Sequence, residues 1–187
     1  MTRTIGAIVL AAGFSTRFGG QKLIKDLPNG NGIFTQTLGR IRSAIPRVKI
    51  ITRPELAKSL SVTQEELYVF KNAEKGIGAT LAFGVSLANE WDGCLVCLAD
   101  MPFIQTKTYQ IIASSLQETG ITVPLYNGKQ GNPVGFGSRF FKELRKLNED
   151  IGGISLTRKY HRNVQYIKVS DPGILKDIDT PEDIESA

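Results

Sequence analysis

Short runs of apolar residues alternate along this chain with stretches in which apolar residues recur every three or four positions. The first pattern is typical of buried strands, and the second is typical of helices that bury one side. Predicted strands cover residues 5–10, 48–52, 67–70 and 94–98, and predicted helices cover residues 34–45, 55–60, 79–88 and 107–117. This alternation predicts an α/β fold with a single doubly wound, mostly parallel sheet and helices on both faces.

The alternation changes in the last third of the chain. Residues 121–126 and 134–136 are predicted strands, and the connection 127–132 is too short for a crossover helix, so we expect antiparallel or edge strands there. A helix at 138–147, a strand at 164–169 and a short helix capped at Thr180 complete the pattern, and Thr106 is expected to cap the helix at 107–117. No repeat or long linker interrupts the chain, so we expect residues 1–187 to form a single domain.

The composition narrows the class of protein. The chain is 41% hydrophobic and 22% charged, which is typical of a globular domain, and the apolar run at 5–12 is far shorter than a membrane span. We therefore expect a cytoplasmic protein that does not contact membranes. The net charge of +5 favours anionic ligands. The basic cluster at 158–162 lacks the interleaved aromatic residues of a single-strand nucleic-acid platform, so we expect no nucleic-acid partner.

Cys94 and Cys97 are the only cysteines of the chain. Their spacing occurs in redox pairs and zinc sites, but residues three apart on a strand point to opposite faces of a sheet. We therefore expect both thiols to serve as small core side chains.

A glycine-rich loop follows the first predicted strand, at the edge where ligands of open α/β sheets bind. Gly13 and Gly19 let the backbone turn tightly and bring N–H groups close to an anion, while Ser15, Arg17 and Lys22 supply further donors. The loop fits neither G-x-x-x-x-G-K-[ST] nor G-x-G-x-x-G. It therefore predicts a polyphosphate site of another type.

Asp100 directly follows the predicted strand at 94–98 and should emerge at the same edge of the sheet as the loop. Mg²⁺ prefers one or two carboxylates, with phosphates and waters completing its octahedron. Asp100 is therefore the first candidate ligand for Mg²⁺. Asp179, before Thr180-Pro181, could merely cap the last helix, and Asp177 would face the same side of an extended segment.

The loop resembles a known family. Residues 10–22 read L-A-A-G-F-S-T-R-F-G-G-Q-K and match every specified position of L-A-A-G-x-S-x-R-x-G-x-x-K, the signature of the MobA-like nucleotidyltransferases. Segments 98–102 (L-A-D-M-P), 131–134 (G-N-P-V) and 177–183 (D-I-D-T-P-E-D) are similar to the same family, in the same order. Ala12 gives L-A-A-G where guanylyltransferases usually carry L-A-G-G, so the chain looks nearest to the molybdenum-cofactor cytidylyltransferases.

This resemblance implies a Rossmann-like fold of the nucleotide-diphospho-sugar transferase type and a role for each matching residue. The implied catalytic residues are Arg17, Lys22 and Asp100, and the implied Mg²⁺ ligands are Asp100 and Asp179, with Asp177 as the alternative second ligand. Asn132 is the implied acceptor-binding residue. The implied nucleotide-binding residues are Leu10, Ala11, Ala12, Gly13, Ser15, Gly19, Gly76, Gly78 and Thr80.

Two segments depart from the family pattern. Residues 75–81 resemble its G-M-S-x-S-L segment, with Gly78 and Thr80 in place of serines. Residues 149–153 resemble G-D-x-G-A-R only in part, because the basic residue at its end is missing. The nucleobase and the acceptor therefore stay open at this point.

The function that the resemblance implies is transfer of a nucleoside monophosphate, with CTP favoured as donor, onto a phosphorylated acceptor with release of pyrophosphate. The implied acceptor is the molybdopterin cofactor, and transient contact with a molybdoenzyme or its chaperone follows from that role. A sugar-phosphate or polyol-phosphate nucleotidyltransferase of the same fold and a noncatalytic nucleotide-binding or pterin-binding module are the alternatives. Arg17, Lys22 and Asp100 together argue against the noncatalytic module, because a mere binder needs no metal carboxylate beside the phosphates.

Overall fold

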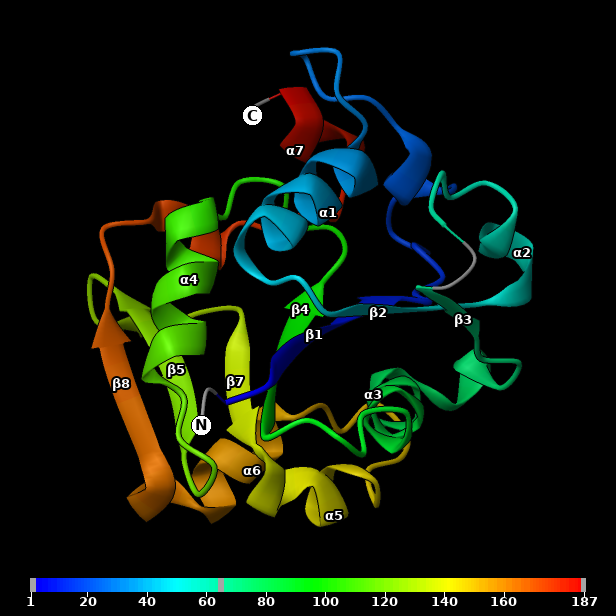
Figure 1. The fold of residues 1–187 in the computed structure, drawn as a ribbon. Coiled ribbons are helices and arrows are strands. Elements are labelled where there is room, and N and C mark those ends of the chain that lie inside the picture. Colours follow the sequence, from blue (N-terminus) through cyan, green and yellow to red (C-terminus); the bar gives the residue numbers. More distant parts are fainter. Residues whose placement is uncertain (1–2, 64–65, 186–187) are drawn as a thin grey trace.

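A mixed β-sheet runs through the middle of the molecule, with helices on both faces (Figure 1). The computed structural model describes residues 3–63 and 66–185. The strand order is β3-β2-β1-β4-β7-β5-β6, and β8 pairs with β5. Four neighbouring strands are parallel: β1 (Ile5–Ala11), β2 (Val48–Thr52), β3 (Leu67–Val69) and β4 (Gly93–Leu98). Parallel strands direct their carboxyl ends to one edge of the sheet, and the loops that follow β1 and β4 meet there.

The other part of the sheet is mostly antiparallel. Strand β7 (Val134–Gly137) pairs antiparallel with both β4 and β5 (Ile121–Tyr126), which confirms the expectation for the short connection between β5 and β7. Strand β6 (Lys129–Gln130) forms a hairpin with the end of β5. Strand β8 (Val164–Lys168) pairs parallel with β5.

Helices α1 (Ile33–Ala44) and α4 (Thr106–Ser115) cover one face of the sheet, together with the short α2 (Pro54–Ala57). Helices α3 (Ile77–Ser86), α5 (Phe141–Leu144) and α6 (Ile154–Lys159) cover the other face. Helix α7 (Pro181–Glu185) packs its Ile184 against the core on the same face of the sheet as α1. The predicted doubly wound α/β fold is therefore confirmed.

The alternation of side chains along the central strands supplies both cores. On β1, Ala7 and Val9 pack toward α1 and α4, while Ile8 and Leu10 pack toward α3. Cys94 and Cys97 lie in opposite cores in the same way, as their spacing predicts. Burial raises the pKa of the Cys94 thiol to about 12 and raises that of Cys97 further, so both thiols remain protonated core groups.

Several element boundaries differ from the sequence prediction. The helix expected at 55–60 is the shorter α2, and the one expected at 138–147 is a 3-10 turn (Ser138–Phe140) followed by α5. Helix α6 was not predicted, because glycines and a short basic stretch hide its periodicity. Further 3-10 turns lie at Lys22–Ile24, Ala73–Lys75, His161–Asn163 and Pro172–Leu175.

The predicted capping role of Thr106 is wrong. Helix α4 begins at Thr106 itself, and Gln105 occupies the capping position without a capping side chain. Asp171, from the distant C-terminal segment, accepts hydrogen bonds from the Gln105 N–H (2.8 Å) and the Thr108 hydroxyl (2.6 Å). A carboxylate from elsewhere in the fold therefore stabilises this helix start, which no local pattern indicates.

Among the described residues, none of the helices is both long and apolar enough to span a membrane.

Candidate functional site

A cavity of about 350 Å³ opens where β1 and β4 end. Its wall combines the loop after β1, the segment around the start of α3, the residues after β4 and the C-terminal segment. We call it the charged cavity. Its lining residues are Leu10, Ala11, Ala12, Gly13, Phe14, Ser15, Arg17, Lys22, Leu23, Ala73, Gly76, Ile77, Thr80, Leu98, Ala99, Asp100, Asp150, Asp177 and Asp179.

The loop after β1 turns sharply through two residues with positive φ, Ser15 (52°) and Gly19 (72°). The Phe18 N–H donates to the Ser15 carbonyl at 3.0 Å and closes a turn between them. A Cβ added at Gly13 would meet no other atom within 4 Å, so glycine leaves this part of the cavity wall open. Gly13 and Ser15 lie on the cavity as expected, whereas Gly19 does not line it and shapes the turn behind it.

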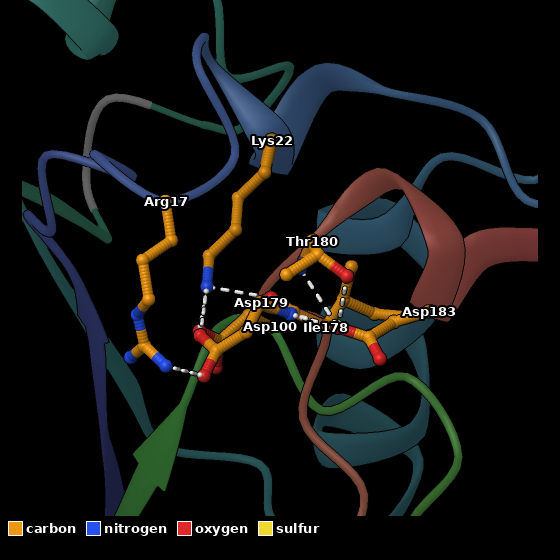
Figure 2. A network of polar contacts seen from close by, with 7 residues as sticks. All are labelled: Arg17, Lys22, Asp100, Ile178, Asp179, Thr180 and Asp183. Carbon is orange, nitrogen blue, oxygen red and sulfur yellow. Dashed lines mark hydrogen bonds and ion pairs between the residues drawn. The ribbon is translucent and has the colours of Figure 1, made fainter.

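One lysine joins two carboxylates at the mouth of the charged cavity (Figure 2). The Lys22 Nζ lies 2.7 Å from Asp100 Oδ2 and 3.1 Å from Asp179 Oδ1, and it donates to the Ile178 carbonyl at 2.6 Å. Burial opposes the charge on Lys22, but the attraction and hydrogen bonds of Asp100 and Asp179 outweigh it and raise the lysine pKa above 10.5. The ammonium therefore stays charged at neutral pH.

Arg17 completes this group of charges. Its Nη1 lies 2.8 Å from Asp179 Oδ2, on the side of the carboxylate away from Lys22 (Figure 2). The Arg17 side chain is 74% exposed, whereas that of Lys22 is 10% exposed. Arg17 can therefore move toward a ligand at little cost, while Lys22 can move only by giving up its contacts with Asp100, Asp179 and Ile178.

The C-terminal segment reaches Asp100 through the backbone, because the Ile178 N–H donates to the Asp100 carbonyl at 3.0 Å. The Asp179 carboxylate faces Lys22 and Arg17 rather than helix α7. At the helix start, Asp183 Oδ2 accepts from the Asp179 and Thr180 N–H groups at 2.8 and 2.7 Å. Asp183 and Thr180 thus cap α7, which leaves Asp179 to the charged cavity.

One observation in particular indicates that these carboxylates could bind a divalent metal. Asp100 Oδ1 is buried and has no hydrogen-bond partner among the described residues, although a buried oxygen normally has one. Asp177 lines the same cavity, and burial together with the nearby Asp179 and Asp100 raises its pKa. No group of three or more His, Cys, Asp or Glu side chains arranged for a metal occurs in the described parts of the chain. Two carboxylates completed by phosphate and water oxygens are what Mg²⁺ commonly takes.

The wall opposite the loop contains Gly76, Ile77 and Thr80. Gly76 has a φ of 96°, and a Cβ there would lie 2.4 Å from the carbonyl carbon of Glu149, so the backbones of the two segments touch. Gly78 is turned toward the same segment, and its N–H donates to the Glu149 carbonyl at 2.8 Å. Gly76 and Thr80 therefore lie on the cavity as the nucleotide-binding prediction requires, whereas Gly78 does not line it.

A second cavity, of about 260 Å³, adjoins the first and shares Leu10, Ile77 and Leu98 with it. Its wall comes from β4, β7, α3 and the start of α6, and it is mainly apolar. We call it the apolar cavity. Asn132, the predicted acceptor-binding residue, lies on it. Its other lining residues are Leu81, Val96, Gln130, Gly131, Val134, Phe136, Gly152, Gly153 and Ile154.

The sequence prediction missed two charged residues near this site. Arg53 is 8% exposed, its guanidinium lies 4.8 Å from the centre of the Phe14 ring, and its Nε donates to the Gly13 carbonyl at 3.4 Å. It directly follows β2, so the same rule that selected Asp100 could have found it. Asp150 lines the charged cavity beside Gly76, and its proximity depends on the contact between two distant segments.

Known proteins similar to this chain were found at low identity. The purine catabolism protein PucB of Bacillus subtilis is 27% identical, over 95% of this chain and 93% of that protein. The molybdenum cofactor cytidylyltransferase of Escherichia coli is 25% identical, over 98% of this chain and 95% of that protein. A probable molybdenum cofactor guanylyltransferase of Thermococcus sibiricus is 32% identical, over 66% of this chain and 62% of that protein.

Solved structures share the fold. Rv0371c of Mycobacterium tuberculosis matches with a TM-score of 0.85 at 24% identity, over 98% of this chain and 97% of that one. A manganese complex of Rv0371c matches with a TM-score of 0.79 at 24% identity, over 99% of this chain and 97% of that one. A nucleotidyl transferase of Methanothermobacter thermautotroptrophicus matches with a TM-score of 0.82 at 21% identity, over 99% of this chain and 96% of that one.

The family model of the MobA-like NTP transferase domain matches residues 7–164, which include the loop after β1 and Asp100. This match supports the predicted nucleotidyltransferase activity, with a nucleoside triphosphate and a phosphorylated acceptor as the substrates that the family implies. It also confirms the resemblance found in the sequence. The chain belongs to the MobA-like NTP transferase family.

Proposed function

We propose that this protein transfers CMP from CTP onto the phosphate of the molybdopterin cofactor, with Mg²⁺ as cofactor and pyrophosphate as the second product. The observation that carries the proposal is the group of charges at the charged cavity, in which Asp100 and Asp179 share Lys22 and Asp100 Oδ1 has no partner among the described residues. Two carboxylates beside the glycine-rich loop suit a metal-bound triphosphate.

The chemistry requires positioning and charge compensation more than proton transfer. An oxygen of the acceptor phosphate, already ionised at neutral pH, forms a bond to the α-phosphorus. The bond from that phosphorus to the oxygen bridging the α- and β-phosphates breaks, and pyrophosphate leaves with the electron pair. A bound Mg²⁺ would supply charge neutralisation on the phosphate oxygens. Arg17 and Lys22 supply hydrogen-bond donors for the charge that develops on the leaving group.

Lys22 must change partners for this role. Its ammonium now lies between Asp100 and Asp179, where it compensates both carboxylates. Asp100 and Asp179 would hold a divalent cation, which would supply the positive charge that Lys22 supplies in this structure. Lys22 would then donate to the phosphate oxygens. Lys22 would thus compensate the carboxylates without a metal and bind the triphosphate with one.

Several features support CTP and a pterin-type acceptor. Ala12 on the charged cavity gives the L-A-A-G form of the loop, and the cytidylyltransferase of Escherichia coli matches nearly the whole chain. The apolar cavity offers the mainly apolar wall and few polar groups that a ring system needs, with Asn132 as a hydrogen-bonding group. It adjoins the charged cavity, so an acceptor ring there could direct its phosphate toward the α-phosphorus.

The test is an assay of pyrophosphate release with each of the four nucleoside triphosphates. Mg²⁺ and Mn²⁺ are compared as metals, and the molybdopterin cofactor, a sugar phosphate and a polyol phosphate are compared as acceptors. We expect the highest rate with CTP and the molybdopterin cofactor. Asp100→Asn should lower kcat by roughly 10²–10³-fold, because the variant loses one charge where the phosphates react. Glu90→Gln, an exposed residue that lines neither cavity, is the matched control and should keep its activity.

Each failure of this assay has a separate meaning. Faster release with the sugar or polyol phosphate would assign the alternative acceptor class, and faster release with GTP would overturn the cytidylyl assignment. Pyrophosphate release that Asp100→Asn leaves unchanged would contradict the proposed site. The same assay with Asp177→Asn and with Asp179→Asn identifies the second metal ligand. It is the residue whose substitution raises more strongly the Mg²⁺ concentration needed for half-maximal activity.

A further inference from the structure

A third hollow lies beyond the apolar cavity, and it is basic. Lys129 from β6, Arg158 from α6 and His161 from the turn after α6 line it. We call it the basic hollow. Its remaining lining residues are Gly128, Gln130, Ile154, Thr157 and Tyr166.

The basic hollow continues the apolar cavity. Gln130 and Ile154 line both, so a ligand that extends past them passes from one to the other. The apolar cavity in turn shares three residues with the charged cavity. The three hollows therefore form a row, with the reacting charges at one end and the basic hollow at the other.

Lys129 and Arg158 give this hollow a positive charge that no neighbouring carboxylate among the described residues compensates. No carboxylate lines it. Within residues 3–63 and 66–185, Lys129, Arg158 and His161 make no ion pair and no side-chain hydrogen bond. The neighbouring Lys159 behaves differently, because its Nζ lies 3.1 Å from Glu143 Oε2.

The hairpin that carries Lys129 is held by backbone pairing and by a side-chain hydrogen bond. Lys129 belongs to the hairpin of β5 and β6, where Leu125 pairs with Gln130 and Tyr126 with Lys129. The Gln130 Nε2 donates to the Tyr166 hydroxyl at 3.2 Å and ties this hairpin to β8. Lys129 on this hairpin and Arg158 on α6 therefore line the hollow from two separate elements.

We propose that the basic hollow binds a second anionic group of the acceptor, separate from its reacting phosphate. This inference rests on the proposed function, in which the acceptor occupies the apolar cavity. Uncompensated cations at the far end of a continuous row would bind an oxyanion by charge-assisted hydrogen bonds. An acceptor with two anionic groups would thereby be fixed at two points, and its reacting phosphate would be directed to the α-phosphorus.

Kinetics on the active protein give the first test. The double variant Lys129→Ala/Arg158→Ala should raise the KM for the acceptor by roughly 10- to 100-fold, since each lost contact is a charge-assisted hydrogen bond. The KM for CTP should stay unchanged, and the salt dependence of acceptor binding should weaken. The control Arg47→Ala/Lys107→Ala removes the same two charges from exposed positions that line none of the three hollows. An equal effect of both double variants, or no effect of the first, would overturn the proposal.

The second test does not need turnover. His161 is the only histidine of the chain, so its imidazole C–H resonances in an NMR spectrum report on this hollow alone. With CTP and Mg²⁺ present to fill the charged cavity, inorganic phosphate should shift these resonances saturably in the wild type and in Arg47→Ala/Lys107→Ala. The shift should be lost in Lys129→Ala/Arg158→Ala. The absence of a saturable shift in the wild type would overturn the proposal.

The two tests separate the inference from the proposed function. If the wild type releases no pyrophosphate with any acceptor, the proposed function fails, and the His161 resonances still show whether the hollow binds an anion. If pyrophosphate is released but the acceptor KM is the same in both double variants, only the inference fails. A short single-stranded oligonucleotide that displaces phosphate at much lower concentration would overturn the assignment to the acceptor in favour of nucleic acid.

Discussion

The charged cavity and the apolar cavity adjoin each other and share three residues, yet they are built differently. The charged cavity takes Arg17, Lys22 and Asp100 from segments that follow the parallel strands β1 and β4, and Asp177 and Asp179 from the C-terminal segment. The apolar cavity takes its wall largely from the surface of strands, with Val96 on β4 and Val134 and Phe136 on the antiparallel β7. Loops after parallel strands bring charged side chains to one edge of a sheet, whereas the faces of strands supply apolar side chains for a cavity wall.

The two cavities also differ in how their polar groups are satisfied. In the charged cavity, Lys22 pairs with Asp100 and Asp179, while Asp100 Oδ1 has no partner among the described residues, and these groups can exchange partners for a metal and phosphates. In the apolar cavity, polar groups are few, and Asn132 has no charged partner there. Substitutions in the first should therefore alter stability and metal affinity together, while substitutions in the second should alter acceptor binding alone.

The largest effect on stability is expected at Lys22. Lys22→Met keeps the length of the side chain but leaves Asp100 and Asp179 close together without their shared cation, which should lower the free energy of unfolding by roughly 3 kcal/mol. Mg²⁺ should restore more stability to this variant than it adds to the wild type, because no ammonium competes for the carboxylates. Urea unfolding with increasing Mg²⁺ measures both effects.

Arg53→Met is the matched control for Lys22→Met. Arg53 is equally buried and pairs with Glu55 at 3.1 Å, away from the two carboxylates. Its loss should also destabilise the fold, but Mg²⁺ should not compensate it. An equal response of both variants to Mg²⁺ would contradict the metal role of Asp100 and Asp179.

Gly76 forms the wall of the charged cavity opposite the loop, and its substitution should have the next largest effect. Gly76→Ala puts a Cβ on a residue with a φ of 96° and 2.4 Å from the Glu149 carbonyl carbon, which should cost about 1–3 kcal/mol or more. Gly39→Ala, in an open position on helix α1, should instead stabilise the protein by about 0.5–1 kcal/mol. Thermal unfolding of the two variants compares them directly, and a Gly76→Ala variant as stable as wild type would contradict the contact with Glu149.

A reciprocal pair of variants tests the division between the cavities. Asn132→Ala should raise the KM for the acceptor by roughly threefold to tenfold, the range expected for one hydrogen bond, and leave the KM for CTP unchanged. Thr80→Val removes the 3.1 Å hydrogen bond from the Thr80 hydroxyl to the Gly76 carbonyl and should raise the KM for CTP alone. Steady-state kinetics with each substrate varied separately measure both. If each variant changed both KM values equally, the two cavities would not be separate subsites.

The smallest effect is expected at Glu143, which connects α5 to the end of α6 through its ion pair with Lys159. Hydrogen bonds from Lys146 and Lys159 lower the pKa of Glu143 from 4.5 to about 2. A lowered pKa in the folded state adds stability that is present above the unfolded pKa and is lost as the pH falls toward 2. Glu143→Gln should therefore lower the melting temperature slightly at pH 7, and the difference should narrow below pH 4.5. A difference that grows on acidification would show that the ion pairs do not stabilise this region.

The sequence was sufficient to predict the parallel part of the sheet and the contents of its edge. The apolar runs of β1 and β4 mark buried strands, and Arg17, Lys22 and Asp100 lie in the segments that follow them. These predictions depend on local patterns and on the rule that parallel strands end at one edge. Helix α6 and the true end of the helix predicted at 138–147 were missed, because short helices stabilised by packing have little periodicity of their own.

The role of individual glycines was harder to predict. Gly13 and Gly76 lie on the charged cavity, whereas Gly19 shapes a turn and Gly78 packs against the backbone of residues 148–151. All four look alike in a sequence, since glycine allows a tight turn, a close contact and an open wall equally well. Only the neighbours of each glycine distinguish these uses.

The sequence by itself determined the kind of fold and which charged residues follow β1 and β4, because strand patterning and loop composition are local properties. The tertiary structure decided which charges meet. Lys22 and Asp179 are 157 positions apart, and they come within 3.1 Å because the C-terminal segment returns to the end of β4 and its Ile178 N–H pairs with the Asp100 carbonyl. The Gly76–Glu149 contact and the adjacency of the three hollows likewise depend on packing between segments that are far apart in the sequence. The free energy of such packing depends on both segments together, so neither segment predicts it alone.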